Sequence, residues 1–230
     1  MSVRIYRALE GGEETVAAGD PGNGISYSAA VVISRKYKDV PVVFSARVES
    51  PQFGYELSNL GLYVKKKTGA YPLLAVERNI GQGTIEKLRD LEYPLDRLYR
   101  QKTFDRVLEK EEERIGWTTT VANRRKMLDT LAMVIRNKEL KIYDKELISE
   151  MLTFVINERT GEPRPESGTY SDLIMACAIT YQMLGEYPTP AEWINSPRPK
   201  DEKFLPKKAG GFITESWKSI EDSKRDWRSS

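Results

Sequence analysis

The sequence predicts an α/β fold in which helices flank a mixed β-sheet. Three consecutive apolar runs joined by short turns, at residues 15–20, 27–35 and 40–49, indicate an antiparallel meander. Strand and helix patterns then alternate along the chain, which is typical of a sheet with parallel pairs and helices on its faces. With 230 residues, the chain has the length of one sizeable domain, or of one domain with a tail.

After the meander, each element is predicted from its periodicity and its stop signals. The run from Tyr55 to Lys67 has leucines near helical spacing, ends in three lysines and is followed by Gly69, a common helix stop. The helices predicted in this way span 55–67, 84–92, 121–137, 145–151 and 171–184. The further strands are predicted at 73–77, 98–100, 140–143 and 152–157.

Three segments do not follow these patterns. Residues 105–114 are densely charged and are compatible with a hairpin or with a helix, whereas 158–168 are predicted as loop. After Tyr187, five prolines interrupt any regular element and aliphatic residues are few. Residues 1–187 are therefore predicted to form the folded domain, and residues 188–230 a proline-rich, poorly structured C-terminal tail.

The composition excludes several kinds of catalytic site. The chain has no histidine, which removes Ser-His-Asp and Cys-His catalysis and histidine-bound zinc. The single cysteine, Cys177, lies in an apolar helical run and is expected to be a core residue. A net charge of +2 does not by itself indicate nucleic-acid binding. Without an 18-residue apolar run or an apolar signal core, the chain is expected to be soluble and intracellular.

Three acidic residues stand at the ends of elements that are predicted to be buried. Asp20 and Glu77 each follow a short apolar strand, and Asp172 opens an apolar helix. Oxygen ligands of this kind suit Mg²⁺ or Mn²⁺. Two such ions about 3.5–4 Å apart can cleave a phosphodiester by activating water and stabilising the leaving oxygen. Structural roles compete with this interpretation: a turn at Asp20, an ion pair at Glu77 and a helix cap at Asp172.

Four short stretches carry a resemblance to the C-terminal nuclease domain of the large terminase subunit of tailed bacteriophages. They are Ala18-Gly19-Asp20-Pro21 with the strand after it, Ala75-Val76-Glu77-Arg78-Asn79, Ile115-Gly116-Trp117-Thr118-Thr119, and Ser171-Asp172-Leu173-Ile174-Met175-Ala176. Each stretch is a weak signal, but their order and spacing over roughly residues 12–184 are fairly specific. The resemblance implies a ribonuclease H-like fold, with a mixed β-sheet flanked by helices.

The resemblance also implies a function. The implied function is that of an endonuclease that cuts double-stranded viral DNA during genome packaging. The catalytic acids Asp20, Glu77 and Asp172 are expected to hold Mg²⁺ or Mn²⁺, and two ions are expected. The family often has two adjacent acids preceded by histidine in its last stretch, whereas this sequence has Tyr170 and Ser171 there. Because Ser171 cannot supply a charge, weaker binding of the second metal is expected.

The implied partners are those of a packaging motor, namely double-stranded DNA, the terminase ATPase domain and the portal, in the cytoplasm of an infected bacterial cell. No Gly-x-x-x-x-Gly-Lys-Ser/Thr phosphate loop occurs, so the ATPase half is expected to be absent from the chain. The isolated domain is expected to be a monomer and to have no contact with a membrane.

Basic residues in three places are candidates for contact with the DNA backbone. Lys65, Lys66 and Lys67 also complement a helix dipole. Arg124, Arg125 and Lys126, which open the helix after Trp117, are therefore the preferred candidates for backbone contact. Trp117 itself is expected to be a core residue. The DNA-binding candidates are Lys65, Lys66, Lys67, Arg100, Lys102, Arg124, Arg125 and Lys126.

Three alternatives remain compatible with the sequence. A branched-DNA resolvase of the same superfamily would keep the fold and change the substrate. An actin-like sugar kinase would use Asp20-Pro21-Gly22-Asn23-Gly24 as a phosphate loop. A domain that only docks DNA or the portal would follow if the loss of an acid at Ser171 abolished catalysis.

Overall fold

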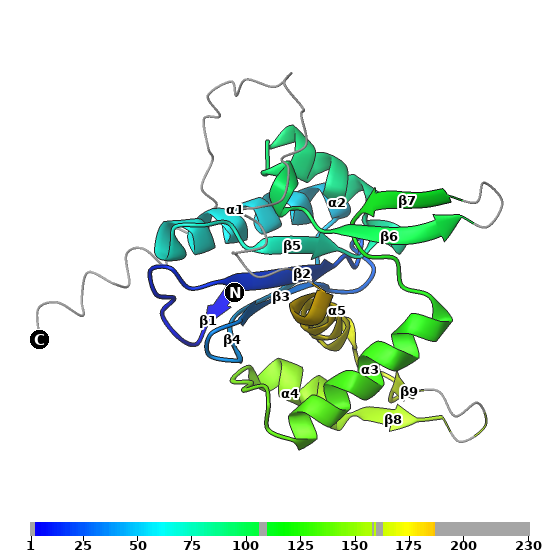
Figure 1. Cartoon of the computed structure of the whole chain (residues 1–230). Coiled ribbons are helices and arrows are strands. Elements are labelled where there is room, and N and C mark those ends of the chain that lie inside the picture. The colour runs from blue at the N-terminus through cyan, green and yellow to red at the C-terminus, as the bar shows by residue number, and fades with distance from the viewer. Residues whose placement is uncertain (1–2, 106–109, 158, 160–162, 187–230) are drawn as a thin grey trace, which may run out of the picture.

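The computed structural model describes residues 3–105, 110–157, 159 and 163–186, and its centre is a five-stranded mixed sheet (Figure 1). The strands are β1 Val3–Ile5, β2 Thr15–Asp20, β3 Ser28–Ser34, β4 Asp39–Ala46 and β5 Leu73–Val76. Their order across the sheet is β1-β4-β3-β2-β5. The pair β2–β5 is parallel and the other pairs are antiparallel, which confirms the predicted meander and the mixed sheet.

Helices cover both faces of this sheet (Figure 1). On one face lie α1 Ser50–Thr68 and α2 Arg78–Asp90, and on the other lie α3 Val121–Arg136, α4 Lys145–Leu152 and α5 Asp172–Glu186. Two small hairpins and a short 3₁₀ helix complete the described chain: η1 Leu95–Arg97, β6 Arg100–Asp105 with β7 Lys110–Ile115, and β8 Phe154–Ile156 with β9 Pro163–Pro165. No helix of the described residues is long and apolar enough to cross a membrane.

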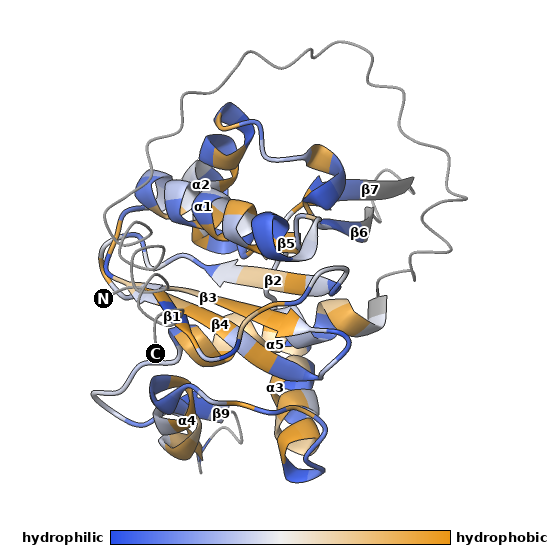
Figure 2. Ribbon diagram, turned by 90° about the vertical axis from the view of Figure 1, so that its left-hand side faces the viewer, coloured by the Kyte–Doolittle hydropathy of each residue, from blue (hydrophilic) through white to orange (hydrophobic). Residues whose placement is uncertain are grey.

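The central strands of the sheet are apolar because helices bury both of their faces. In β3, Val31 and Ile33 pack with α5 on one face, while Val32 packs with α1 on the other. A strand covered on both sides is expected to be continuously apolar, as β3 is. Figure 2 shows the hydrophobic residues concentrated in β3, β4 and α5 at the centre of the molecule. Cys177 of α5 is fully buried, as predicted, and burial raises the pKa of its thiol to about 12.

The elements differ from the predicted ones in several places, one being α1, which begins at Ser50 and not at Tyr55. Helix α2 begins at Arg78, six residues before the predicted start, because Gly81 and Gly83 weaken the helical signal of its first turns. Residues 140–143 form only a single bridge, from Lys141 to Asp39, and not a strand. Strand β9 lies where loop was predicted, and β1 was not predicted at all. Both are three-residue strands, too short to show a period.

The described ends of the charged segment 105–114 form a hairpin and not a helix. Strand β6 pairs with β7, and the register runs from the pair Arg100 and Ile115 to the pair Asp105 and Lys110. The predicted tail, residues 188–230, lies outside the described residues.

Candidate active site

The parallel pair of strands brings Asp20 and Glu77 to the same edge of the sheet. Gly19 and Val76 are the last register partners of β2 and β5. The backbone N–H of Glu77 then donates to the carbonyl oxygen of Gly19 at 2.9 Å. Because both strands run in the same direction, Asp20 at the end of β2 and Glu77 just after β5 lie at the same edge of the sheet.

The segment around Trp117 extends the sheet next to Glu77. The Trp117 N–H donates to the Val76 oxygen at 2.8 Å, and the Arg78 N–H donates to the Trp117 oxygen at 2.7 Å. Gly116 allows this approach, since it has a φ of +93° and a Cβ there would lie 2.6 Å from the Val76 oxygen. Trp117 is buried, as predicted. The Glu77 carboxylate is thereby enclosed, with 8% of the residue exposed.

Asp172 reaches the same region from the N-terminus of α5. Its carboxylate accepts a hydrogen bond from the Ser26 hydroxyl at 3.1 Å and another from the backbone N–H of Tyr27. Ser26 belongs to the tight turn after Asp20, in which the Ser26 N–H donates to the Gly22 oxygen. Two segments 146 positions apart are therefore joined directly, and the helix-start acid faces the turn that follows β2.

A fourth carboxylate, which the sequence did not indicate, belongs to the same group. Glu150, on α4, accepts hydrogen bonds from the backbone N–H groups of Leu173 and Ile174, the latter at 3.0 Å. These donors belong to the first turn of α5, where N–H groups lack partners within the helix. Glu150 thus lies against the start of the helix that carries Asp172. The amphipathic pattern of α4 indicates a helix there, but not which helix end its acids meet.

Three other acids lie close enough to Asp20 to act on its charge. Burial raises the pKa of the Asp20 carboxyl well above its ordinary value, and the charges of Glu77, Asp172 and Glu150 raise it further. Arg124 acts in the opposite direction. A carboxylate in this position is stabilised in its charged form only when cations compensate its neighbours.

The other three acids are affected mainly by their own burial. Burial raises the pKa of Glu77 and of Asp172, against the opposing effect of nearby hydroxyl groups, those of Thr119 and Ser26 respectively. Burial also raises the pKa of Glu150 to about 7, and the charge of Asp172 adds to this shift. The pKa of each of the four carboxyl groups therefore lies above its ordinary value when no cation is bound.

The oxygen atoms of these acids suit a hard divalent cation, although they do not form a preorganised coordination site. Three carboxylates act on Asp20, and oxygen ligands of this kind match Mg²⁺ and Mn²⁺. Within the described part of the chain, no three acidic or cysteine side chains converge closely enough to hold one ion as they stand. Mutual repulsion between carboxylates opposes such convergence in the absence of a cation.

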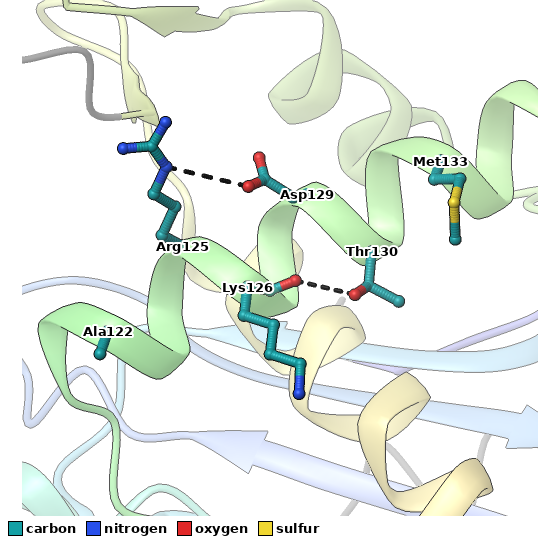
Figure 3. Close-up of a pocket in the computed structure, with 6 residues that line it drawn as sticks. All are labelled: Ala122, Arg125, Lys126, Asp129, Thr130 and Met133. Atoms are coloured by element: carbon teal, nitrogen blue, oxygen red, sulfur yellow. Dashed lines mark hydrogen bonds and ion pairs between the residues drawn. The ribbon is translucent and has the colours of Figure 1, made fainter.

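Among the predicted DNA-binding residues, Arg124 alone acts on the acids electrostatically. It lies in the first turn of α3, lowers the pKa of both Asp20 and Glu77, and donates to the Pro163 oxygen at 3.3 Å. Arg125 and Lys126 are exposed and extend to different sides of the helix, along an open hollow of about 400 Å³ (Figure 3). Arg125 forms an ion pair with Asp129 there, at 3.9 Å.

The other candidate DNA-binding residues lie on α1 and on the β6–β7 hairpin. Lys65, Lys66 and Lys67 form the last turn of α1. That turn is bonded to the segment before β2 through Gly12 and Thr68, so it lies at the end of the sheet opposite Asp20. Arg100 pairs with Gly116 at the base of the β6–β7 hairpin, and Lys102 forms an ion pair with Glu113 at 3.7 Å.

Comparison with solved structures shows which proteins share this fold. The large terminase nuclease of thermophilic phage G20c is similar with a TM-score of 0.59 and 12% identity, over 79% of this chain and 88% of that one. The large terminase nuclease domain of Thermus phage P74-26 gives 0.55 and 13%, over 80% and 86%. The human cytomegalovirus terminase nuclease domain, soaked with manganese and with inhibitor bound, gives 0.52 and 12%, over 75% and 83%.

These similarities confirm the expected ribonuclease H-like fold of terminase nucleases. The G20c nuclease has also been solved with bound magnesium and with bound cobalt. No protein-family profile matches the chain, and no curated protein matches its sequence.

Proposed function

We propose that this chain is a divalent-metal-dependent endonuclease domain that cuts double-stranded DNA during the packaging of a viral genome. One observation carries the proposal: Asp20, at the end of β2, is surrounded by the charges of Glu77, Asp172 and Glu150. These acids come from four separate elements, on a fold shared with terminase nuclease domains. A purely structural role does not explain why four partly buried carboxylates should gather, since like charges destabilise the folded protein.

Asp20, Glu77 and Asp172 are the residues that would hold the ions. Mg²⁺ or Mn²⁺, bound there, would neutralise the acids and supply the activation of water and the stabilisation of the leaving oxygen that phosphodiester hydrolysis needs. Glu150 is the fourth candidate ligand and offsets the missing charge at Ser171, where the resembling family often has an acid. With this residue, the site has as many carboxylates as a site with two adjacent acids on the helix.

The chain's own residues would position the reacting groups. Ser26 and the backbone of Tyr27 hold the Asp172 carboxylate, and the backbone bonds of Glu77 to Gly19 hold the two strand ends together. Arg124, next to Asp20 and Glu77, would bind a phosphate oxygen of the DNA. The sequence has no histidine, so no imidazole can serve as general base.

The motor assignment extends this proposal. Terminase nucleases act with an ATPase domain and a portal, and the same partners, in the cytoplasm of an infected cell, are proposed for this chain. Lys65, Lys66 and Lys67 lie at the end of the sheet opposite Asp20, so they would contact only a duplex long enough to wrap around the domain.

The structure argues against a phosphate loop after Asp20. The backbone N–H groups of Gly22, Gly24, Ile25 and Ser26 all donate to oxygen atoms within the protein, so they are not free to bind a nucleotide phosphate. A sugar-kinase function is therefore not favoured. A branched-DNA resolvase differs in substrate alone, and a docking domain differs in lacking catalysis.

A cleavage assay distinguishes these functions. The wild-type domain is expected to nick supercoiled plasmid and cut linear duplex with Mn²⁺ or Mg²⁺, and to lose both activities in chelator. Asp20→Asn should lose cleavage, while Asp129→Asn, which removes an exposed acid from α3, should retain it. Exclusive cutting of four-way junctions would indicate the resolvase, and metal binding without any cleavage would indicate the docking domain. Full metal-dependent cleavage by Asp20→Asn would overturn the proposal.

A further inference from the structure

A cleft of about 730 Å³ adjoins the acids on the side of α4 and α5. Its walls come from α4, from the ends of β3 and β4, and from the segment that leads into α5. The lining includes Tyr27, Ala46, Glu150, Thr153 and Tyr170. Glu150 lines this cleft and also acts on the charge of Asp20, so the cleft lies next to the candidate active site.

Arg47 is held in a defined position at the margin of this cleft. Ser28 and Ala46 are register partners at the end of the β3–β4 pair, and Tyr27 and Arg47 each lie one residue beyond. The guanidinium carbon of Arg47 lies 5.1 Å from the centre of the Tyr27 ring. It lies 5.9 Å from the centre of the Tyr170 ring, and an Arg47 nitrogen donates to the Tyr170 hydroxyl at 2.7 Å.

The two tyrosines form a rigid support. Their ring centres are 5.0 Å apart and their planes are nearly perpendicular, a favourable edge-to-face arrangement. The same residues are tied to the acids, because the Tyr27 N–H bonds to Asp172 and Tyr170 precedes Asp172 by two positions. The position of the Arg47 guanidinium is therefore fixed relative to the active site.

Arg47 differs from the other arginines of this side of the fold in its charge balance. Arg4, which also lines the cleft, is neutralised by Asp144 and by Glu146 at 2.8 Å, and Arg7 by Glu13 and Asp39. Arg47 is exposed and makes no ion pair with an acid among the residues that the structure describes. Its interactions leave further guanidinium N–H groups available, and a guanidinium can bind phosphate through two parallel hydrogen bonds.

We propose that Arg47, supported by Tyr27 and Tyr170, binds a backbone phosphate of the DNA that occupies the active site. This inference rests on the proposed function. Arg47 would bind on the Asp172 side of the acids, whereas Arg124 lies on the Asp20–Glu77 side. The two arginines would then hold the strand on both sides of the bond to be cut. Because Arg47 is ordered before DNA arrives, little further conformational entropy is lost on binding.

Salt-dependent binding tests this role. A fluorescein-labelled duplex would be titrated with the domain in chelator and, in parallel, in Ca²⁺, at several salt concentrations, and read by anisotropy. Each phosphate contact contributes about 0.9 to the slope of log K against log salt. Arg47→Ala is expected to bind about 10-fold more weakly at low salt, with a slope smaller by about 0.9.

Three variants separate binding from structural support. Lys36→Ala removes the same charge from the opposite end of the β3–β4 pair, where Lys36 pairs with Glu10, and should leave the slope unchanged. Arg47→Lys keeps the charge and should keep the slope. Arg47→Gln keeps a polar side chain beside Tyr170 and should lose the slope as Arg47→Ala does, which covers the case in which Arg47→Ala fails to fold.

The outcomes bear separately on the two proposals. If wild type binds DNA but Arg47→Ala and Arg47→Gln keep its slope and affinity, Arg47 is only a support for the segment before α5 and this inference is overturned. If wild type binds no DNA in either buffer, the proposed function fails and the inference fails with it. Equal losses in Lys36→Ala would show a general charge effect and would also overturn the specific role of Arg47.

Discussion

The Glu150 carboxylate of α4 accepts a hydrogen bond from the backbone N–H of Ile174, in the first turn of α5, at 3.0 Å. This bond stabilises the helix end that carries Asp172, since an anion is favourable at a helix N-terminus. The same carboxylate is close enough to Asp20 to raise the pKa of that group. Glu150 thus stabilises the helix end that carries Asp172 while its charge repels that of Asp20.

Glu150 makes the stability of the metal-free protein depend on pH. Its pKa is raised from 4.5 to about 7, so the folded protein binds a proton more tightly than the unfolded chain. Stability from this group is therefore complete below about pH 4.5 and falls as pH rises to about 7, by about 1–3 kcal/mol. Glu150→Gln should flatten this decline in thermal unfolding between pH 5 and pH 8 in chelator.

The matched control for this prediction is Glu86→Gln, which neutralises an exposed acid on α2 outside the cluster. It should reproduce the pH dependence of wild type. A decline of the same size in Glu150→Gln would show that other groups cause it, Asp20, Glu77 and Asp172 being the nearest candidates.

Metal binding should reverse the repulsion around Asp20. In chelator above neutral pH, Asp20→Asn is expected to unfold at a higher temperature than wild type, because it removes one of four neighbouring charges. Addition of Mn²⁺ at 100 times its dissociation constant should stabilise wild type by about 2.7 kcal/mol, which corresponds to roughly 5–10 °C. Asp20→Asn should show little of this shift in differential scanning fluorimetry. An equal Mn²⁺ shift in both proteins would place the ion elsewhere.

The sequence predicts the part of this site that comes from strand ends. Asp20 and Glu77 follow apolar runs, and parallel strands must release their next residues at one edge. The prediction of α2 was less complete, because Gly81 and Gly83 lower helix propensity at its start. A Cβ at Gly81 would lie 2.9 Å from the Val76 side chain and 3.0 Å from Pro21, so close packing explains this glycine, a relationship that a local pattern does not contain.

Glu150 and Arg47 could not be predicted in the same way. Each is an ordinary charged residue in its local sequence, one on an amphipathic helix and the other at the end of a strand. Their roles arise from contacts with residues 24 and 123 positions away, with Ile174 and Tyr170 respectively. Sequence periodicity reports which face of an element is buried, and it carries no information about which other element covers that face.

Gly116 should be far less tolerant of substitution than Gly69. Both have a φ of +93°, so alanine is strained at either position. A Cβ at Gly69 meets nothing within 4 Å, whereas a Cβ at Gly116 would lie 2.6 Å from the Val76 oxygen. That oxygen accepts the Trp117 N–H that holds the segment next to Glu77. Gly69→Ala is expected to cost about 1 kcal/mol and Gly116→Ala about 3 kcal/mol or more in urea unfolding.

Cleavage should follow the same order. Gly69→Ala should cut plasmid at the wild-type rate, while Gly116→Ala, measured where it is still folded, should be slower because Glu77 is displaced. Equal stability losses in the two variants would mean that the Trp117 segment can move away from Val76 without penalty, and would remove it from the support of the site.

Arg124 is expected to act on the chemical step as well as on binding. It is the one cation that offsets the charge of both Asp20 and Glu77 in the described structure, and it stands in the first turn of α3 beside them. Loss of a hydrogen bond to a charged phosphate costs about 1.5–3 kcal/mol, so Arg124→Ala should lower the rate of plasmid cleavage roughly 10- to 100-fold at saturating protein. Arg136→Ala removes an exposed arginine from the last turn of the same helix and should cleave at the wild-type rate. If both variants cleave equally well, the charge next to Asp20 has no part in the reaction, and the phosphate contact must come from the Arg47 side alone.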